Sequence, residues 1–162
     1  METRNYKALK GVAFTAALLC AVHIIWLCAQ TWFISGMGSS EGEINWSEDI
    51  YPFQLTVLLA RLLFCTAYYA TIIIFIVRTI KGLKSGIIFP QSNVPLLFTT
   101  AGCYFIGTLM SDNYDNILLT QTPNATYFAI ESNTILITFI YIIFALLYKI
   151  AANVSEENNL TI

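Results

Sequence analysis

Charged side chains are scarce in this sequence. Asp, Glu, Lys and Arg make up only 11% of its 162 residues, hydrophobic residues make up 57%, and the mean hydropathy is +0.66. In soluble globular domains, about a quarter of the residues are charged. The composition therefore predicts one all-α membrane domain over residues 1–162. The eight basic residues are too few and too scattered for a basic surface, so we expect no direct nucleic-acid partner.

Side chains that carry catalysis or bind metals are also sparse. His23 is the single histidine, and the four cysteines form no C-x-x-C pair or other metal-ligand spacing. Cys20 and His23 lie three residues apart on one helix face, but two ligands are only half of a metal site. No carboxylate lies within a long apolar run. We predict no enzyme activity, metal or cofactor, and interpret Cys20, Cys28, Cys65 and Cys103 as small buried hydrophobic residues.

Four long apolar runs predict helices that cross a membrane, at about residues 11–33, 53–77, 94–110 and 134–148. A bilayer core about 30 Å thick needs about 20 apolar residues of helix. The third run is only 17 residues long and contains Pro95, which the first turn of a helix tolerates. The first run is longer than the apolar part of a signal peptide, about 7 to 15 residues, so we expect it to be retained as a helix.

The distribution of charge predicts how these helices are threaded. The segments after the first and third runs contain seven carboxylates and no Lys or Arg. Seven of the eight basic residues lie before the first run or after the second and fourth, namely Arg4, Lys7, Lys10, Arg78, Lys81, Lys84 and Lys149. Short cytoplasmic segments accumulate Lys and Arg. We therefore predict a four-transmembrane-helix bundle with both termini in the cytoplasm, together with a polar tail at 149–162.

Arg61 is the one charged residue inside a predicted span. A charge within a membrane is by default a candidate for contact with an ion or substrate. A structural role competes with that hypothesis, because Arg78 marks the inner boundary and Arg61 then lies near the outer surface, where its side chain can snorkel. We favour the structural role and expect an acidic outer residue, such as Glu48 or Glu131, as its partner.

Weakly polar side chains recur at helical spacing in each run. Such seams pack membrane helices together, because lipid supplies no hydrophobic drive between them. His23 and Gln30 share a face of the first helix, which we predict to look inward and to form hydrogen bonds across helices. The other predicted seams are Arg61, Cys65, Tyr68 and Tyr69 in the second run, Thr99, Cys103 and Gly107 in the third, and Thr134, Thr138, Tyr141, Ala145 and Tyr148 in the fourth.

Two features of the acidic segments give further expectations. Ser47 is followed by Glu48 and Asp49, which suits a helix N-cap and the positive end of the helix dipole. The segment 117–130 is less apolar than the spans, and we expect it to lie along the outer surface.

Two short motifs carry a resemblance to a known family. Lys84, Gly86, Phe89, Asn93 and Val94 open the third run, and the chain closes on Glu156, Glu157, Leu160, Thr161 and Ile162. Together they resemble the bacterial membrane family named domain of unknown function 2975. The sequence departs from that pattern at Pro90 and at Pro95, Leu96 and Leu97. The resemblance implies four spans in a bacterial cytoplasmic membrane and, because some members are encoded beside a small helix-turn-helix regulator, one component of a sensing or regulatory pair. It implies no catalytic residue.

We predict a non-enzymatic multi-pass membrane protein that binds a partner through its cytoplasmic segments. Leu160 and Ile162 are expected to pack against residues 87–89. The partner would be a cytoplasmic regulator, another membrane protein or a second copy of the chain. The alternative is a small transporter or channel subunit that uses Arg61, His23 and the acidic loops. The candidate contact residues are Lys81, Lys84, Phe89, Asn93, Glu156, Glu157, Leu160, Thr161 and Ile162.

Overall fold

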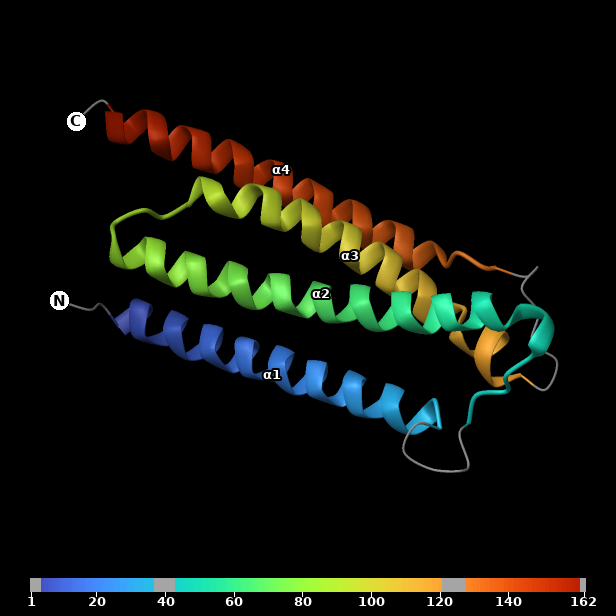
Figure 1. Cartoon of the computed structure of the whole chain (residues 1–162). Helices are drawn as coiled ribbons and strands as arrows, with labels where there is room; N and C mark the ends of the chain where they lie inside the picture. Colours follow the sequence, from blue (N-terminus) through green and yellow to red (C-terminus); the bar gives the residue numbers. More distant parts are fainter. Residues whose placement is uncertain (1–3, 37–42, 121–127, 161–162) are drawn as a thin grey trace.

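The computed structural model describes residues 4–36, 43–120 and 128–160, and the regular structure in these ranges is entirely helical (Figure 1). The long helices are α1 (Arg4–Ile34), α2 (Tyr51–Lys84), α3 (Val94–Asp112) and α4 (Ser132–Leu160). Short turns precede α2 and α3, at η1 (Glu48–Ile50) and η2 (Gln91–Asn93), and a π-helical turn, η3 (Asp115–Leu119), follows α3. Four helices are long and apolar enough to cross a membrane, which confirms the all-α, four-helix prediction.

Consecutive helices run in opposite directions, so both chain ends and the α2–α3 connection lie at the same end (Figure 1). The main helix contacts are α1 on α2, α2 on α3, and α3 on α4, and α1 is the least buried helix. We name the two ends by their charges. The basic end carries Lys7, Lys10, Arg78, Lys81 and Lys84, and the acidic end carries Glu43, Glu48, Asp49, Asp112, Asp115 and Glu131.

The helices extend beyond the predicted apolar spans. Helix α1 begins at Arg4, α2 continues to Lys84, and α4 continues to Leu160, so most of the predicted polar tail is helical. The prediction was short because hydropathy detects only the apolar part of a helix, whereas Lys and Glu are themselves good helix formers. Helix α2 ends where Gly86 adopts a φ of 79°, and the Ile87 N–H donates to the Gly82 carbonyl at 2.9 Å. This left-handed glycine is a common helix stop.

A small core closes the acidic end. Ile117 and Leu118 in η3 are fully buried against Ile44, Val57 and other apolar side chains. The expectation that 117–130 lies along the outer surface is therefore wrong for its first residues, while residues 121–127 lie outside the described ranges. The π-helical turn folds Ile117 and Leu118 back toward the start of α2, where their apolar side chains are removed from solvent.

Gln54 connects the three segments that meet at the acidic end. Its side-chain amide donates to the carbonyls of Asn45, at 2.9 Å, and Ile117, at 2.8 Å, and its Oε1 accepts from the Ser47 N–H at 2.9 Å. Ser47 occupies the N-cap position of η1, as predicted, but its side chain forms no capping hydrogen bond. The chain instead uses Gln54 to satisfy backbone groups in this turn.

A second core lies toward the basic end. Leu97, Ala145, Tyr148 and Ala152 are buried there, with Phe89 packed against them. The predicted α4 seam is confirmed, because Thr134, Ala145 and Tyr148 are buried and Thr138 and Tyr141 are half-buried.

The predicted α3 seam is correct at Cys103 and Gly107 but wrong at Thr99, which is exposed. The buried threonine is Thr100, whose Oγ1 lies 2.9 Å from Thr71 Oγ1 on α2. Thr99 lies four residues before Cys103 and Thr100 lies three residues before it. Both spacings place a side chain on the same helix face as Cys103, so the spacing alone did not decide between the two threonines.

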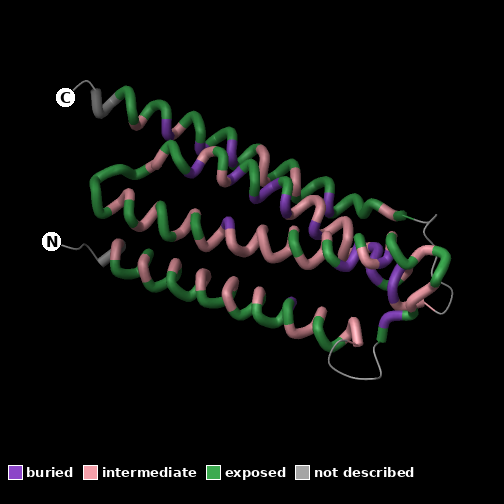
Figure 2. The backbone as a smooth tube through the Cα atoms, viewed as in Figure 1, coloured by how far each residue is buried: buried purple, intermediate pink, exposed green. Residues whose placement is uncertain are grey.

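Large apolar side chains cover the outside of the molecule. Helices α1 and α4 are largely exposed along their length (Figure 2). Phe14 and Trp26 on α1 are 71% and 63% exposed, and Leu136 on α4 is 60% exposed. A soluble monomer rarely presents contiguous apolar patches of more than a few hundred Å². Helices that face lipid do present such a surface. Their backbone polar groups are hydrogen-bonded within the helix, so only apolar side chains meet the lipid.

Candidate functional site

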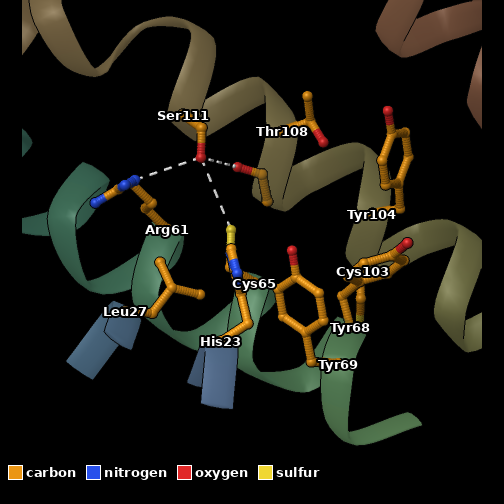
Figure 3. A pocket seen from close by; sticks show the side chains of 11 residues that line it. His23, Leu27, Arg61, Cys65, Tyr68, Tyr69, Cys103, Tyr104, Thr108 and Ser111 are labelled. Carbon is orange, nitrogen blue, oxygen red and sulfur yellow. Dashed lines mark hydrogen bonds between the residues drawn. The ribbon is translucent and has the colours of Figure 1, made fainter. Parts of the chain in front are cut away.

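A cleft lined by both apolar and polar groups opens between α1, α2 and α3, and we name it the Arg61 cleft (Figure 3). It has a volume of about 200 Å³. Helix α1 contributes two side chains, and α2 and α3 contribute the rest. The lining residues are His23, Leu27, Arg61, Cys65, Tyr68, Tyr69, Cys103, Tyr104, Gly107, Thr108 and Ser111.

Arg61 reaches sideways from α2 to both neighbouring helices. Its Nε donates to Ser111 Oγ on α3 at 3.3 Å, and its Nη2 donates to Gln30 Oε1 on α1 at 3.3 Å. The guanidinium carbon also lies 4.5 Å from the centre of the Tyr114 ring. This cation–π contact and the two hydrogen bonds fix the guanidinium at the side of the cleft.

The predicted acidic partner of Arg61 is not found. Among the described residues, Arg61 forms no ion pair with Glu48, Glu131 or any other carboxylate. Glu48 lies thirteen residues earlier, about 20 Å along a helix axis, which is too far for an arginine side chain. Ser111 and Gln30 are the polar residues at the same depth as Arg61. They accept the hydrogen bonds of the guanidinium, for which the sequence had predicted a carboxylate.

His23 lies at the α1 side of the cleft, stacked on an aromatic cluster. Its ring centre is 4.5 Å from that of Tyr69 on α2. Tyr68 contacts Tyr69 and Tyr104, and its hydroxyl lies 2.7 Å from the Tyr141 hydroxyl on α4. His23 and Gln30 both contact α2, and Gln30 forms the predicted hydrogen bond across helices, to Arg61. His23 is exposed and forms no hydrogen bond within the described part of the chain, so the prediction is wrong for His23 in that respect.

The four cysteines are unpaired. Cys103 is buried, and Cys20 and Cys65 are half-buried. Cys28 is exposed on α1, so its interpretation as a buried residue is wrong. Because an isolated helix turns every face outward except the one that touches its neighbour, an apolar run does not reveal which of its residues is covered.

A second hollow, the basic-end groove, lies between the α2–α3 connection and the last turns of α4. Its volume is about 390 Å³. Gln91 joins the two sides, with Nε2 at 2.7 Å from Asn153 Oδ1 and 3.3 Å from Glu156 Oε2. The lining residues are Ile87, Phe89, Pro90, Gln91, Ser92, Ala152, Ser155 and Glu156.

Two of the predicted cytoplasmic contact residues are structural. The Asn93 side chain is fully buried, and its Nδ2 donates to Thr79 Oγ1 at 3.0 Å and Tyr148 Oη at 3.1 Å. Phe89 packs edge-on against Tyr148, with ring centres 5.5 Å apart, and only partly lines the groove. Asn93 is therefore not available to a partner, since its amide joins α2, α3 and α4.

The other candidate contact residues lie on the surface or beyond the description. Lys81, Lys84, Glu156 and Glu157 are exposed. The side chain of Leu160, and the residues Thr161 and Ile162, are outside the described part of the chain, so their predicted packing against 87–89 stays a prediction. The contact between the connection and α4 is instead made by Gln91 with Asn153 and Glu156.

Comparison with known protein families, characterised proteins and solved structures finds no match. The resemblance to domain of unknown function 2975 stays a prediction. In the ranges that the structure describes, the chain forms four helices that could cross a membrane, the Arg61 cleft nearer the acidic end and a groove at the basic end.

Proposed function

We propose that this chain is a multi-pass protein of the bacterial cytoplasmic membrane that acts without catalysis, by binding a protein partner at its cytoplasmic basic end. The apolar outer surface of α1 and α4 carries the membrane part of the proposal, because Phe14, Trp26 and Leu136 would be costly to expose to water. The opposite charges of the two ends support the orientation, since Lys and Arg accumulate in cytoplasmic segments.

The basic-end groove supports the partner-binding part. Ile87 is 45% exposed at the groove, while Phe89 and Ala152 form a floor held by the buried Tyr148. A pocket with a rigid apolar floor and a polar rim is the usual setting of an interface hot spot. Lys81 and Lys84 are exposed at the same end, whereas Glu156 lines the groove itself. The partner that fits is therefore a cytoplasmic protein with an apolar anchor side chain for the groove and acidic residues placed to meet the two lysines.

The family resemblance supports a regulator as that partner. Some members of that family are encoded beside a small helix-turn-helix protein. Such a gene pair implies that a membrane component and a cytoplasmic component act together. The groove would then transmit a change in the helices to the regulator by binding or releasing it.

A matched pair of neighbouring isoleucines tests the groove. Ile87 lines it, whereas Ile88 is similarly exposed and does not. We expect a photoreactive phenylalanine at Ser92, in native membranes, to form an adduct with one cytoplasmic protein. Ile87→Glu should reduce the adduct by at least about tenfold, because a charge is placed in an apolar contact, while Ile88→Glu should leave it intact.

Two results would remove the basis for this function. One is the absence of a protein adduct from Ser92. The other is an adduct that survives Ile87→Glu unchanged, since the adduct would then reflect mere proximity.

A small transporter or channel subunit is the second candidate function, and the Arg61 cleft favours it. The cleft presents a cation and several hydroxyls between helices, as substrate paths in membranes do. Its lining shares no residue with the basic-end groove. Ion flux across vesicles containing the purified chain separates the two functions. We expect no flux above that of empty vesicles, and flux that is lost in Arg61→Gln would favour transport.

A further inference from the structure

The Arg61 cleft carries a positive charge that no carboxylate in the described ranges balances. The groups that contact the guanidinium, on Ser111, Gln30 and Tyr114, are all uncharged. Asp112, next to Ser111, forms no ion pair with Arg61, and its Oδ2 accepts a hydrogen bond from Thr134 Oγ1 on α4 at 2.9 Å. An arginine is always charged in a protein, so the cleft holds a partly buried cation.

The hydrogen-bond donors of the cleft are only partly used. A guanidinium has five N–H groups, and those of Arg61 make two hydrogen bonds to described residues, both at 3.3 Å. That is longer than the usual N–H···O distance of about 2.9–3.0 Å. Within the described part of the chain, the hydroxyls of Thr108, Tyr69 and Tyr104 on the lining form no hydrogen bond. These hydroxyls line the same cleft as Arg61 and can donate to a ligand there.

We propose that the Arg61 cleft binds a phosphate-type oxyanion, with Arg61 as the charged ligand and the hydroxyls of Thr108 and Tyr69 as further donors. Arginine matches the geometry of phosphate, because two parallel N–H groups can reach two oxygens. The remaining phosphate oxygens need additional donors, which the cleft supplies.

The volume of the cleft limits the ligand. About 200 Å³ equals the share of roughly six or seven liquid water molecules at about 30 Å³ each. That space holds one phosphate group and excludes a whole nucleotide. The phosphate can belong to a free inorganic ion or to the headgroup of an anionic lipid whose acyl chains stay outside the cleft.

A purely structural role explains the arrangement less well. A neutral side chain could join Gln30 to Ser111 without placing a charge between helices, and an unbalanced charge away from water is costly. An oxyanion beside Arg61 would balance that charge and take the N–H groups that described residues leave unused. The arrangement therefore fits a cleft that binds an oxyanion better than a purely structural link between the helices.

Calorimetric titration of the full chain in micelles of an uncharged detergent tests the proposal. The probes are inorganic phosphate and phosphatidylglycerol, with diacylglycerol as the lipid control that lacks phosphate. We expect saturable binding of at least one phosphate probe and none of diacylglycerol. Binding of inorganic phosphate identifies a free oxyanion as sufficient, whereas binding of phosphatidylglycerol alone identifies a lipid headgroup.

Two substitutions of the same type locate the site. Arg78 on α2 is exposed and donates from Nη1 to the Ser92 carbonyl, away from the cleft. Arg61→Gln should weaken phosphate binding by about tenfold or more, as expected for loss of a charge-assisted pair, while Arg78→Gln should not change it. Thr108→Val removes only a hydroxyl without a protein hydrogen bond, so it should fold normally and weaken binding about threefold or more.

The proposal is overturned if neither phosphate probe binds, or if Arg61→Gln and the unmodified chain bind with equal affinity. If Arg61→Gln does not fold, Thr108→Val decides, and an unchanged affinity in that variant overturns the assigned donor set.

Discussion

Replacing Gly107 by leucine is expected to destabilise the protein by about 1–3 kcal/mol or more, because it overfills a close contact between α2 and α3. A Cβ atom at Gly107 would lie 3.0 Å from Cys65 Sγ and 3.1 Å from the Cys65 backbone nitrogen. Backbone at that distance cannot move aside without shifting a whole helix. Thermal unfolding in mild detergent, followed by near-ultraviolet circular dichroism, measures the loss.

Gly102→Leu is the matched control for this experiment. Gly102 lies on the same helix, and a Cβ there would meet nothing within 4 Å. The control should be neutral or slightly stabilising, because leucine is a better helix former than glycine by up to about 1 kcal/mol. Equal unfolding temperatures for Gly107→Leu and Gly102→Leu would show that α2 and α3 do not meet at Gly107.

Replacing Gln54 by leucine is expected to cost several kcal/mol and to unfold the acidic end first. Gln54 is 0% exposed and satisfies the backbone groups of Asn45, Ser47 and Ile117. Each buried polar group left without a partner costs about 1–3 kcal/mol, and leucine has a similar volume, so the loss is of hydrogen bonds rather than of packing. Hydrogen exchange of residues 43–58 and 114–119 should rise before that of α4.

Gln91→Leu provides the comparison, because it removes an exposed glutamine that also bridges two segments. It should change stability by less than about 1 kcal/mol, since water replaces the lost partners. If both glutamine variants lost the same stability, Gln54 would not be the buried connector that the acidic-end core requires.

The sequence predicts the helices well because one physical signal dominates it. Apolar residues in runs of about 20 are long enough to cross a bilayer, and no soluble alternative buries such runs. The ends of the helices are less predictable, since α4 continues through polar residues up to Leu160. Helical hydrogen bonding there does not depend on hydropathy. The antiparallel arrangement of the helices brings the start of α1 and the end of α2 to one end of the bundle, as the segregation of charge requires (Figure 1). The orientation of the bundle in a membrane stays a prediction.

The interior contacts could be predicted only in part. Spacing identifies a face, so the α4 seam and the inward face of Gln30 follow from the sequence. It does not identify which residues of two helices lie level with each other. The register of α2 against α3 depends on close contacts such as that of Gly107 with Cys65. This register places Arg61 next to Ser111 and not next to a carboxylate.

Gln54 was missed for a related reason. A glutamine near the start of an apolar run resembles an interfacial residue, and its partners come from the loop before α2 and from the turn after α3. The signal that could have found it is the apolar character of Ile117 and Leu118. Two such side chains in an acidic loop indicate that another segment, here the start of α2, buries them.

The most direct test of the account is cysteine accessibility in intact cells, using a membrane-impermeant maleimide and a chain without its native cysteines. Single cysteines at Glu48, Ser85 and Leu136 represent the acidic end, the basic end and the apolar side. We predict that Glu48→Cys is labelled in intact cells and Ser85→Cys only after permeabilisation. Leu136→Cys should resist labelling in both conditions, although its side chain is 60% exposed, because lipid covers it. Labelling of Ser85→Cys in intact cells, or ready labelling of Leu136→Cys, would contradict a four-span protein with a cytoplasmic basic end.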